Sequence, residues 1–493
     1  MAATMNVLAR VAFVGALAIA AVLHSGVAPA VAAELTFEQE RRIGAREHPL
    51  IVQRYGGEYP DPAVRRYVSE VGARVVQAIT ATPYEFVFSV LDNGDAYAFA
   101  LPGGYVYITR QMLALANSEA ELAAVLAHEV AHITERHANQ RNVLQAELRN
   151  APAAQGAAQM HEFTREQELE ADAVSIRLMA KAGYDPMAQA RFLTTVGLQA
   201  DLVQRAGEPG PRDPNTHPSI VERVRRAVSL THEVERDAKG RRDHADAALL
   251  AGYMPKDEPQ PLSWVTGREP FLRAIDGLVY GRRPSEGMVA GTTYYDTMNR
   301  FSFVLPPGFH FSRANRSVGA DGPNGASMMF DIQITRTPPT EGIVAYVTRS
   351  VSANFELTDI EERVVDGAMP AVFGRARVSG PGGQPAELLI AYVRVTPTAF
   401  FRFQFFLPGP PSSGRAERVL DSPMSLRRLT DAEARAITPL RIHVVTVGEG
   451  TEIEALAAQM RALDHPLDWL VMLNRLDPGA DPKAGDKIKL VVQ

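Results

Sequence analysis

The sequence predicts an α+β protein with three folded units behind an N-terminal leader. A chain of 493 residues is long for a single domain. Apolar residues recur at helical spacing in residues 34–235, whereas 264–440 alternates short strand-like runs with turn residues. Residues 441–493 follow a strand–helix–helix–strand order. We therefore expect a leader over 1–33, these three units, and a charged, then proline-rich linker over 236–263.

The leader has the pattern of a secretory signal peptide. Arg10 precedes an apolar run, Val11–Leu23, and the small residues Ala30-Val-Ala32 resemble a cleavage site, so we expect cleavage near Ala32 or Ala33. A run of about 13 residues is short for a membrane span, and an uncleaved anchor is the alternative. The chain has no cysteine, which excludes disulfides and lipid attachment to cysteine.

Composition favours globular units over a general nucleic-acid binder. Hydrophobic residues make up 46% of the chain, which is enough for ordinary cores. The net charge is −6 with 22% charged residues, so the basic excess that attracts a phosphate backbone is missing.

The most informative motif is His-Glu-Val-Ala-His at 128–132. A helix is predicted there because Ser118 and Glu121 form a capping-box pattern, and Glu119–Arg141 contains neither glycine nor proline. Side chains at i and i+4 share one helical face, so His128 and His132 can reach one metal ion. Glu129 is placed to take a proton from a water that the metal activates. The alternative is an exposed helix with two unrelated histidines among the 12 in the chain.

A catalytic zinc ion needs a third protein ligand. His137 fails on geometry, because it lies five residues after His132 and about 140° round a straight helix. The longer metzincin motif also requires a glycine and a later histidine that this chain lacks. We therefore expect His137 to be a solvated residue at the helix end.

The next predicted helix offers a better ligand. Glu168 and Asp172 fall on its small, apolar face, and carboxylates that pack inward need a partner such as a metal or a histidine. Glu168 is the expected third ligand, and Asp172 is the expected acceptor that orients a ligand histidine. The alternative is a pair of core acids in salt bridges. The other charged residues of the helix share its opposite, solvated face: Glu166, Glu170, Arg177 and Lys181.

Four stretches together resemble the HtpX/BepA-like zinc metallopeptidases, peptidase family forty-eight of the gluzincin type. They are Ala-Tyr-Ala-Phe-Ala-Leu-Pro-Gly-Gly-Tyr-Val-Tyr-Ile (96–108), the motif at 128–132, Arg-Glu-Gln-Glu-Leu-Glu-Ala-Asp (165–172), and Asn-Thr-His-Pro (215–218) followed by Arg223. The match covers residues 35–235, less than half of the chain, and Thr164 stands where the family more often has serine. It implies a mainly helical zincin-type metallopeptidase domain with a small antiparallel sheet.

The resemblance also implies one zinc ion per chain and assigns roles to single residues. His128, His132 and Glu168 are the implied zinc ligands, Glu129 is the implied general base, and His217 and Arg223 are implied active-site residues that could stabilise an oxyanion. For His217, the alternative is a turn residue that caps a helix over 219–229.

A small sheet is expected to bind the substrate. Phe86–Leu91 and Ala96–Ala100 flank Asn93-Gly94, a strong hairpin signal, and a turn at 102–104 leads into Tyr105–Thr109. An extended peptide could add to the edge along Ala96–Ala100 through main-chain hydrogen bonds, which suits unfolded or misassembled proteins as substrates. The alternative is a purely structural meander.

The remaining segments carry no catalytic constellation. The polar residues 139–159 are expected to be a mobile cover over the cleft or a loosely packed helix extension. The 264–440 unit is interpreted as an interaction or positioning module. Its predicted strands are Phe301–Leu305, Ser327–Thr337, Arg375–Ser379, Ala386–Arg394 and Phe400–Leu407, and its predicted helices lie near 341–354 and 430–437.

Residues 441–493 resemble a LysM module. The resemblance rests on Leu473-Asn-Arg-Leu476, the Ala-Gly-Asp-Lys-Ile run, and the βααβ order. It implies binding to peptidoglycan, although Glu449 departs from the usual acid placement in the turn. The alternative is a small helper fold that packs on the rest of the chain.

The preferred function is a zinc endopeptidase of protein quality control in the periplasm of a Gram-negative bacterium, with unfolded or misassembled envelope proteins as substrates. Peripheral association with a membrane is a further expectation. Two alternatives are a non-proteolytic chaperone or assembly factor that uses the same cleft, and a cell-wall binding protein that uses the LysM-like module.

Overall fold

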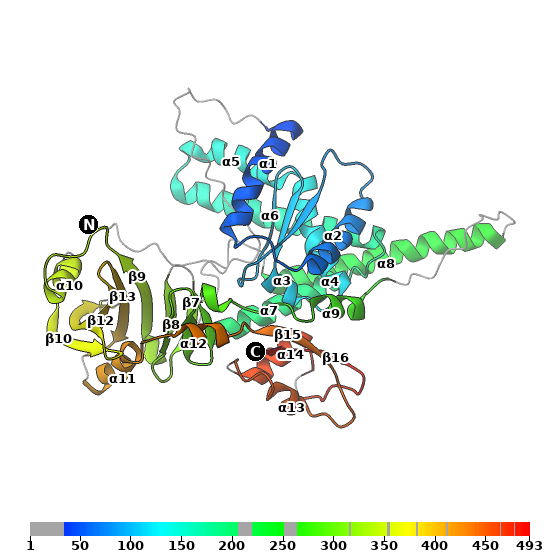
Figure 1. Cartoon of the computed structure of the whole chain (residues 1–493). Coiled ribbons are helices and arrows are strands. Elements are labelled where there is room, and N and C mark those ends of the chain that lie inside the picture. The colour runs from blue at the N-terminus through cyan, green and yellow to red at the C-terminus, as the bar shows by residue number, and fades with distance from the viewer. Residues whose placement is uncertain are drawn as a thin grey trace.

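The computed structural model describes residues 34–205, 219–250, 264–314, 317–352, 355–380, 383–410, 413–463, 465–477 and 479–493. The expected leader and the end of the expected linker lie outside these residues. The described chain forms a helical unit, a unit built on a large sheet, and a small C-terminal unit (Figure 1). Among the helices in these ranges, none is long and apolar enough to cross a membrane.

The first unit packs helices and a small sheet around α4 (Figure 1). The strands run in the order β1-β3-β2, with β1 parallel and β2 antiparallel to β3. Its elements are α1 (Phe37–Arg54), α2 (Pro62–Gln77), β1 (Val87–Leu91), β2 (Ala98–Leu101), β3 (Tyr105–Thr109), α3 (Arg110–Leu115), α4 (Glu119–Thr134), α5 (His137–Glu147), η1 (Leu148–Asn150), α6 (Ala153–Lys181), α7 (Ala188–Arg205) and α8 (Ile220–Leu250).

The expected hairpin around Asn93-Gly94 is wrong, because β1 pairs with β3 and not with β2. The hairpin forms at the next turn, where residues 102–104 join β2 to β3. Gly103 and Gly104 have positive φ angles of 94° and 106° there, and a Cβ on Gly104 would collide with the carbonyl oxygen of Glu85. The sheet is therefore mixed instead of antiparallel, and β2 is one of its edges.

Two helix boundaries also differ from the prediction. The helix expected over Glu119–Arg141 ends at Thr134, and α5 begins after Arg136, whose φ angle is 57°. The helix expected over 219–229 continues as α8 to Leu250, through the first half of the expected linker. The break after Thr134 has no glycine or proline to announce it, since residues 135–137 are Glu-Arg-His.

The second unit is built on an antiparallel sheet in the order β10-β11-β12-β13-β9-β8-β7. One face meets the smaller sheet β14-β6-β5-β4 across an aromatic core, and α10 covers the other face. Its elements are η2 (Pro284–Glu286), β4 (Met288–Ala290), β5 (Thr293–Asp296), β6 (Phe301–Val304), β7 (His310–Ala314), β8 (Val318–Asp321), η3 (Pro323–Gly325), β9 (Ser327–Ile334), α10 (Ile343–Ser352), β10 (Thr358–Val365), β11 (Met369–Ser379), β12 (Pro385–Thr396), β13 (Ala399–Pro408), α11 (Ser413–Met424), β14 (Arg427–Arg428) and α12 (Asp431–Ala436).

The predicted strands and helices of this unit are confirmed, with shifted ends, but the sequence analysis missed several elements. The missed elements are β4, β5, β7, β8, β10, α11 and β14. In β10 the reason is clear, because every residue except Val365 is exposed and the strand has no alternating pattern to detect.

The C-terminal unit consists of β15 (Arg441–Thr446), α13 (Ile453–Ala457), α14 (Pro466–Asn474) and β16 (Lys487–Val492), which is the expected order. The strands pair antiparallel. The assignment of this unit as a LysM-like module stays a prediction.

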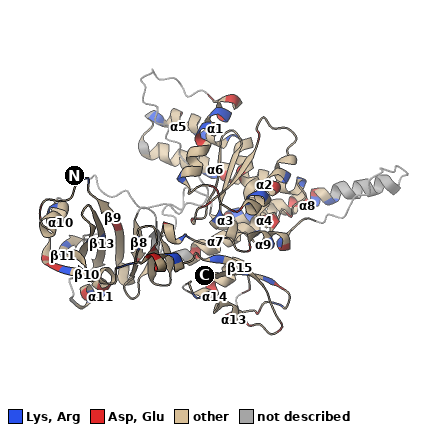
Figure 2. Ribbon diagram, viewed as in Figure 1, with Lys and Arg blue, Asp and Glu red and all other residues tan. Residues whose placement is uncertain are grey.

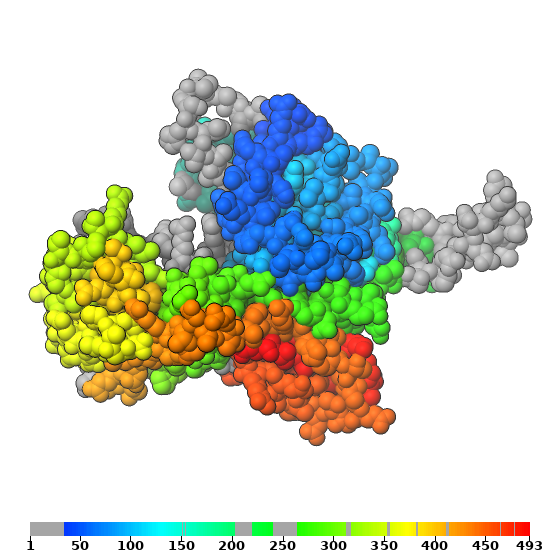
Figure 3. Space-filling model, viewed as in Figure 1, coloured from blue at the N-terminus to red at the C-terminus, as the bar shows by residue number. Residues whose placement is uncertain are grey.

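The C-terminal unit shares one hydrophobic core with the first unit. Between them lies α9 (Arg268–Ile275), which buries Phe271, Leu272 and Ile275. The amide of Glu119 donates to the carbonyl of Gly267 at 3.2 Å, and the residues after α9 bond to β15. Residues 264–280 thus pack against the first and third units, outside the large sheet. In Figure 3 they belong to the green band along the base of the first unit.

Polar contacts tie the C-terminal unit to the start of α4. Lys489 is fully buried, and its Nζ donates to the carbonyl oxygens of Ala114 and Ala116 at 2.8 and 2.7 Å. Arg475 forms an ion pair with Glu121 in the first turn of α4. These contacts hold the segment that leads into α4 from outside the first unit.

Charged side chains of both signs are interspersed along the ribbons of all three units (Figure 2). The strands of the large sheet are mostly uncharged, apart from the exposed edge strand β10. Neither sign of charge therefore gathers over one of the three units in this view.

We expect Lys489→Met to destabilise the protein by about 3 kcal/mol, because it keeps the volume but leaves two buried carbonyl groups without a donor. Lys487→Met is the matched control, since among the described residues the Nζ of Lys487 donates to the exposed Thr446 hydroxyl and to no buried group. The free energy of unfolding from urea denaturation measures both. Equal stabilities would show that the buried hydrogen bonds of Lys489 do not secure the two units.

Candidate metal centre

Both histidines of the motif lie on α4, which is buried in the middle of the first unit. The hydroxyl of Ser118 accepts from the amide of Glu121 at 3.2 Å, and the Glu121 carboxylate accepts from the amide of Asn117 at 2.9 Å. The predicted cap is therefore confirmed, with its second bond one residue earlier than in a standard capping box. Every residue from Glu119 to Ile133 is buried. Polar side chains in this helix consequently need partners inside the protein.

Three potential metal ligands converge where α4 packs on α6. The Nε2 atoms of His128 and His132 lie 3.1 Å apart. Each lies 3.5 Å from a carboxylate oxygen of Glu168: Oε2 for His128 and Oε1 for His132. The three side chains are buried, with Glu168 only 1% exposed. The structure thus brings together the three residues that the sequence analysis singled out as ligands.

These donor atoms suit a tetrahedral cation. At zinc–ligand distances of 2.0–2.2 Å, tetrahedral donor atoms lie about 3.3–3.6 Å from one another. Among the described residues, Glu168 Oε2 is buried and has no hydrogen-bond partner, although the Arg223 guanidinium lies 3.3 Å from it in an ion pair. A bound cation would supply the direct partner that this oxygen lacks. The group could hold one metal ion, and the two nitrogens with one carboxylate match the donor set of a catalytic zinc site.

Glu129 lies beside the ligands on α4 and is only 3% exposed. Burial raises the pKa of its carboxyl to about 7, although the nearby His128 acts to lower it. A pKa near neutrality suits a group that accepts and returns a proton.

Asp172 lies behind His128, one helical turn after Glu168. Its Oδ1 is 3.1 Å from Nδ1 of His128, so the imidazole can turn Nε2 toward a metal. Burial acts to raise the pKa of the Asp172 carboxyl, but Arg223 and His128 hold it well below its usual value. The position is the one expected of an acceptor that orients a ligand histidine.

Arg223, which the resemblance implies as an active-site residue, is buried on α8 and faces the acids. It also lines a second pocket together with His128 and Glu129. Its Nε and Nη2 each donate to Asp172 at 2.7 Å, and its Nη1 lies 3.3 Å from Glu168 Oε2. Its guanidinium therefore orients the two carboxylates that face the histidines.

His137 is not the solvated residue that the helical wheel predicts. It is fully buried, its Nδ1 lies 2.8 Å from Nδ1 of His132, and its Nε2 lies 3.3 Å from Glu170 Oε2. The prediction is wrong because it assumes one straight helix, whereas the break at Arg136 turns α5 back toward the site. A line of contacts thus runs from Glu170 through His137 to His132.

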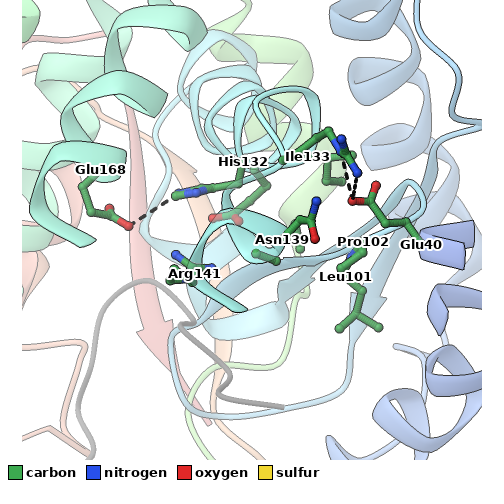
Figure 4. Close-up of a pocket in the computed structure, with 12 residues that line it drawn as sticks. Glu40, Leu101, Pro102, His132, Ile133, Asn139, Arg141 and Glu168 are labelled. Carbon is green, nitrogen blue, oxygen red and sulfur yellow. Dashed lines mark hydrogen bonds and ion pairs between the residues drawn. The ribbon is translucent and has the colours of Figure 1, made fainter. Parts of the chain in front are cut away.

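A pocket opens beside Glu129 and His132 (Figure 4). It is bounded by the end of β2, by α4, α5 and α6, and by α1. Its lining residues are Glu40, Ala100, Leu101, Pro102, Glu129, His132, Ile133, Arg136, Ala138, Asn139, Arg141 and Glu168.

The α5 side of this pocket was not predicted from the sequence. Residues 139–159 were expected to be a mobile cover or a loosely packed helix extension, but α5 is a separate helix that contributes Asn139 and Arg141 to the wall. The usable signal was the i, i+4 pair of His137 and Arg141, two polar residues on one helical face. His217, which the resemblance implies, lies outside the described residues.

Comparison with known proteins finds a family model that matches this part of the chain. The profile described as Peptidase family M48 matches residues 62–159 and 147–231. These ranges include all three candidate ligands and Glu129. The predicted resemblance is therefore confirmed for this part of the chain, and the family is zinc-dependent.

Curated proteins are similar to the same part of the chain. A protein named putative beta-barrel assembly-enhancing protease from Vibrio cholerae is 31% identical over 254 residues, covering 45% of this chain and 51% of the relative. The beta-barrel assembly-enhancing protease of Escherichia coli (strain K12) is 28% identical over 204 residues, covering 35% and 41%. The mitochondrial metalloendopeptidase OMA1 of Schizosaccharomyces pombe is 26% identical over 219 residues, covering 41% and 64%. The chain thus spans about half the length of the relatives it matches.

We expect the purified protein to bind one zinc ion per chain, and His132→Ala or Glu168→Ala to weaken zinc binding by more than about 100-fold, since loss of an outer partner alone costs 10–100-fold. Glu166→Ala, which removes an exposed acid from the same helix, is the control. Metal analysis and chelator competition measure the result. Full zinc affinity in both ligand variants would contradict this site.

We expect His137→Ala to weaken zinc binding by about 10–100-fold, because His132 loses the acceptor for its Nδ1–H. His137→Asn should restore part of the affinity, since its amide oxygen can accept that hydrogen bond. The d–d spectrum of the cobalt-substituted protein reports the ligand geometry independently of activity. Identical zinc affinities and spectra in the wild type and His137→Ala would show that His137 does not orient His132.

Proposed function

We propose that this protein is a zinc-dependent endopeptidase that hydrolyses peptide bonds of unfolded or misassembled envelope proteins. One observation carries the proposal: three buried donor atoms suited to zinc face one another, and the buried carboxylate of Glu129 lines the same pocket as His132 and Glu168. Such a pocket combines a cation site with a group that can carry a proton.

The roles of the residues follow from their positions. Zn²⁺, when bound, supplies Lewis acidity that activates water and polarises the scissile carbonyl. Glu129 takes the proton from the attacking water and gives it to the leaving amine as the C–N bond breaks. His128, His132 and Glu168 would hold the ion.

Two groups act through these ligands. Asp172 fixes the ring of His128, and Arg223 fixes the carboxylates of Asp172 and Glu168. We propose this positioning role for Arg223, and the oxyanion role that the resemblance implies stays a prediction. For His217, which the family resemblance implies, the proposal of an active-site role rests on that resemblance alone.

The edge strand β2 is the proposed binding site for an extended substrate. Its only strand partner among the described residues is β3, and Ala100 and Leu101 at its end line the pocket together with Glu129. A peptide that adds to this edge would be held by main-chain hydrogen bonds, which select an extended chain more than particular side chains. Unfolded segments meet that requirement, and folded domains do not.

The setting is proposed from the sequence and the relatives. The signal-peptide pattern over 1–33 and relatives named beta-barrel assembly-enhancing protease in Gram-negative bacteria favour the periplasm. The LysM-like unit at 441–493 is the proposed contact for peptidoglycan, and peripheral contact with a membrane is compatible with this setting. The unit built on the large sheet is the proposed interaction or positioning module.

We expect Glu129→Gln to reduce the cleavage of casein by at least about 100-fold, because the amide cannot accept the proton. Glu166→Gln, an exposed acid-to-amide change on α6, should leave cleavage unaltered. Zinc content is measured alongside, and both variants should retain the ion. Undiminished cleavage by zinc-loaded Glu129→Gln would remove this residue from the mechanism.

The same variant separates the endopeptidase from a chaperone or assembly factor that uses the pocket without hydrolysis. Cells that carry Glu129→Gln in place of the wild type should show the defect of a deletion strain if hydrolysis is the function. Full complementation by Glu129→Gln would favour the chaperone.

A further inference from the structure

Three arginines lie around the metal centre, and two of them are already paired. Arg223 donates to both oxygens of Asp172. Arg136 at the pocket rim donates to the carboxylates of Glu40 and Glu34 and to a backbone carbonyl of the N-terminal segment. Their charges are therefore neutralised by partners of the protein itself.

Arg141 is the exception. Among the described residues, the one hydrogen-bond partner of its guanidinium is the neutral amide oxygen of Gln167, which is 3.1 Å from Nη1. The guanidinium lines the pocket together with Glu129, His132 and Glu168 (Figure 4). Burial acts to lower the pKa of Arg141, whereas the carboxylates of Glu168 and Glu129 act to raise it, so these acids lie within electrostatic reach.

The protein also holds Arg141 in place. Gln167 is buried, and its amide nitrogen donates to the carbonyl of His137 at 3.1 Å and to Oε1 of Gln140 at 3.0 Å. These bonds fix which way the amide oxygen points, and that oxygen fixes Arg141. A cation held in this manner needs little reorganisation when charge appears in the pocket.

We propose that Arg141 is a catalytic residue that stabilises the negative charge that develops on the scissile carbonyl oxygen. The proposal rests on the proposed endopeptidase function. In peptide hydrolysis the attacking water forms a bond to the carbonyl carbon, and the π electrons of the carbonyl move onto its oxygen. Glu129 holds the water proton at that stage. Arg141 lines the same pocket as Glu129 and has donors left for the oxygen.

A rival role for an unpaired pocket arginine is the binding of an acidic substrate side chain. That role raises the affinity of substrate and transition state equally, so it changes KM and leaves kcat unaltered. The position of Arg141 with Glu129, His132 and Glu168 favours the role at the reacting carbonyl.

The test compares zinc-loaded wild type with Arg141→Ala, Arg141→Lys and the exposed control Arg177→Ala, using full chains. Arg141→Ala should lower kcat on casein-derived peptides by about 100-fold, with KM changed by less than about threefold. Arg141→Lys should recover part of the rate, because an ammonium keeps the charge but not the planar fork. Affinity for a phosphonamidate peptide, an anion that resembles the tetrahedral transition state, should fall in parallel with kcat/KM.

Each outcome has a different meaning. If Arg141→Ala leaves kcat unaltered and raises KM only for peptides that carry acidic residues, the proposal is overturned in favour of substrate recognition. If Arg141→Ala loses zinc, the proposal is overturned in favour of a structural role. A wild type that cleaves no peptide overturns the proposed endopeptidase function instead. Phosphonamidate affinities then still decide on Arg141: about 100-fold weaker binding by Arg141→Ala supports an anion site, and equal binding excludes it.

Discussion

The structure of the first unit depends on charged groups that are buried where α4 packs on α6. The carboxylates of Glu129, Glu168 and Asp172 are all buried there. The guanidinium of Arg223 pairs with Glu168 and Asp172, and the imidazoles of the motif face the same acids. Buried carboxylates are unfavourable unless cations and hydrogen bonds compensate for them. Arg223 contributes one positive charge, and a divalent metal between the histidines and Glu168 would supply the rest. A cation that stabilised the packing of α4 on α6 would therefore also be the ion that the proposed hydrolysis uses.

The break between α4 and α5 places α5 along one side of the pocket at the candidate metal centre. Arg136 adopts a left-handed backbone conformation, and its side chain is held by the N-terminal segment through Glu34 and Glu40. Because of this break, α5 returns across the site instead of continuing into solvent. One face of α5 then supplies His137 behind a ligand and Arg141 in the pocket. A short N-terminal segment thus helps to shape the candidate metal centre.

The C-terminal unit supports α4 from the opposite end. Its Lys489 and Arg475 reach the segment that starts α4, and α9 fills the core between the units. The buried amine of Lys489 finds its hydrogen-bond acceptors in the first unit, so the two units pack together instead of being joined by the linker alone. The C-terminal unit is therefore part of the framework that positions the motif. A contact of this kind joins residues that lie 375 positions apart.

The sequence by itself determined the parts that depend on local spacing. Helical periodicity placed His128 and His132 on one face, and the burial expected of the small, apolar face of the next helix identified Glu168. Tertiary structure alone decided the parallel pairing of β1, the position of Arg223 behind the acids, and the burial of His137. Each of these depends on partners distant in the chain, or on a break with no glycine or proline to signal it. Local patterns report the conformation of a segment, but only packing decides which segments meet.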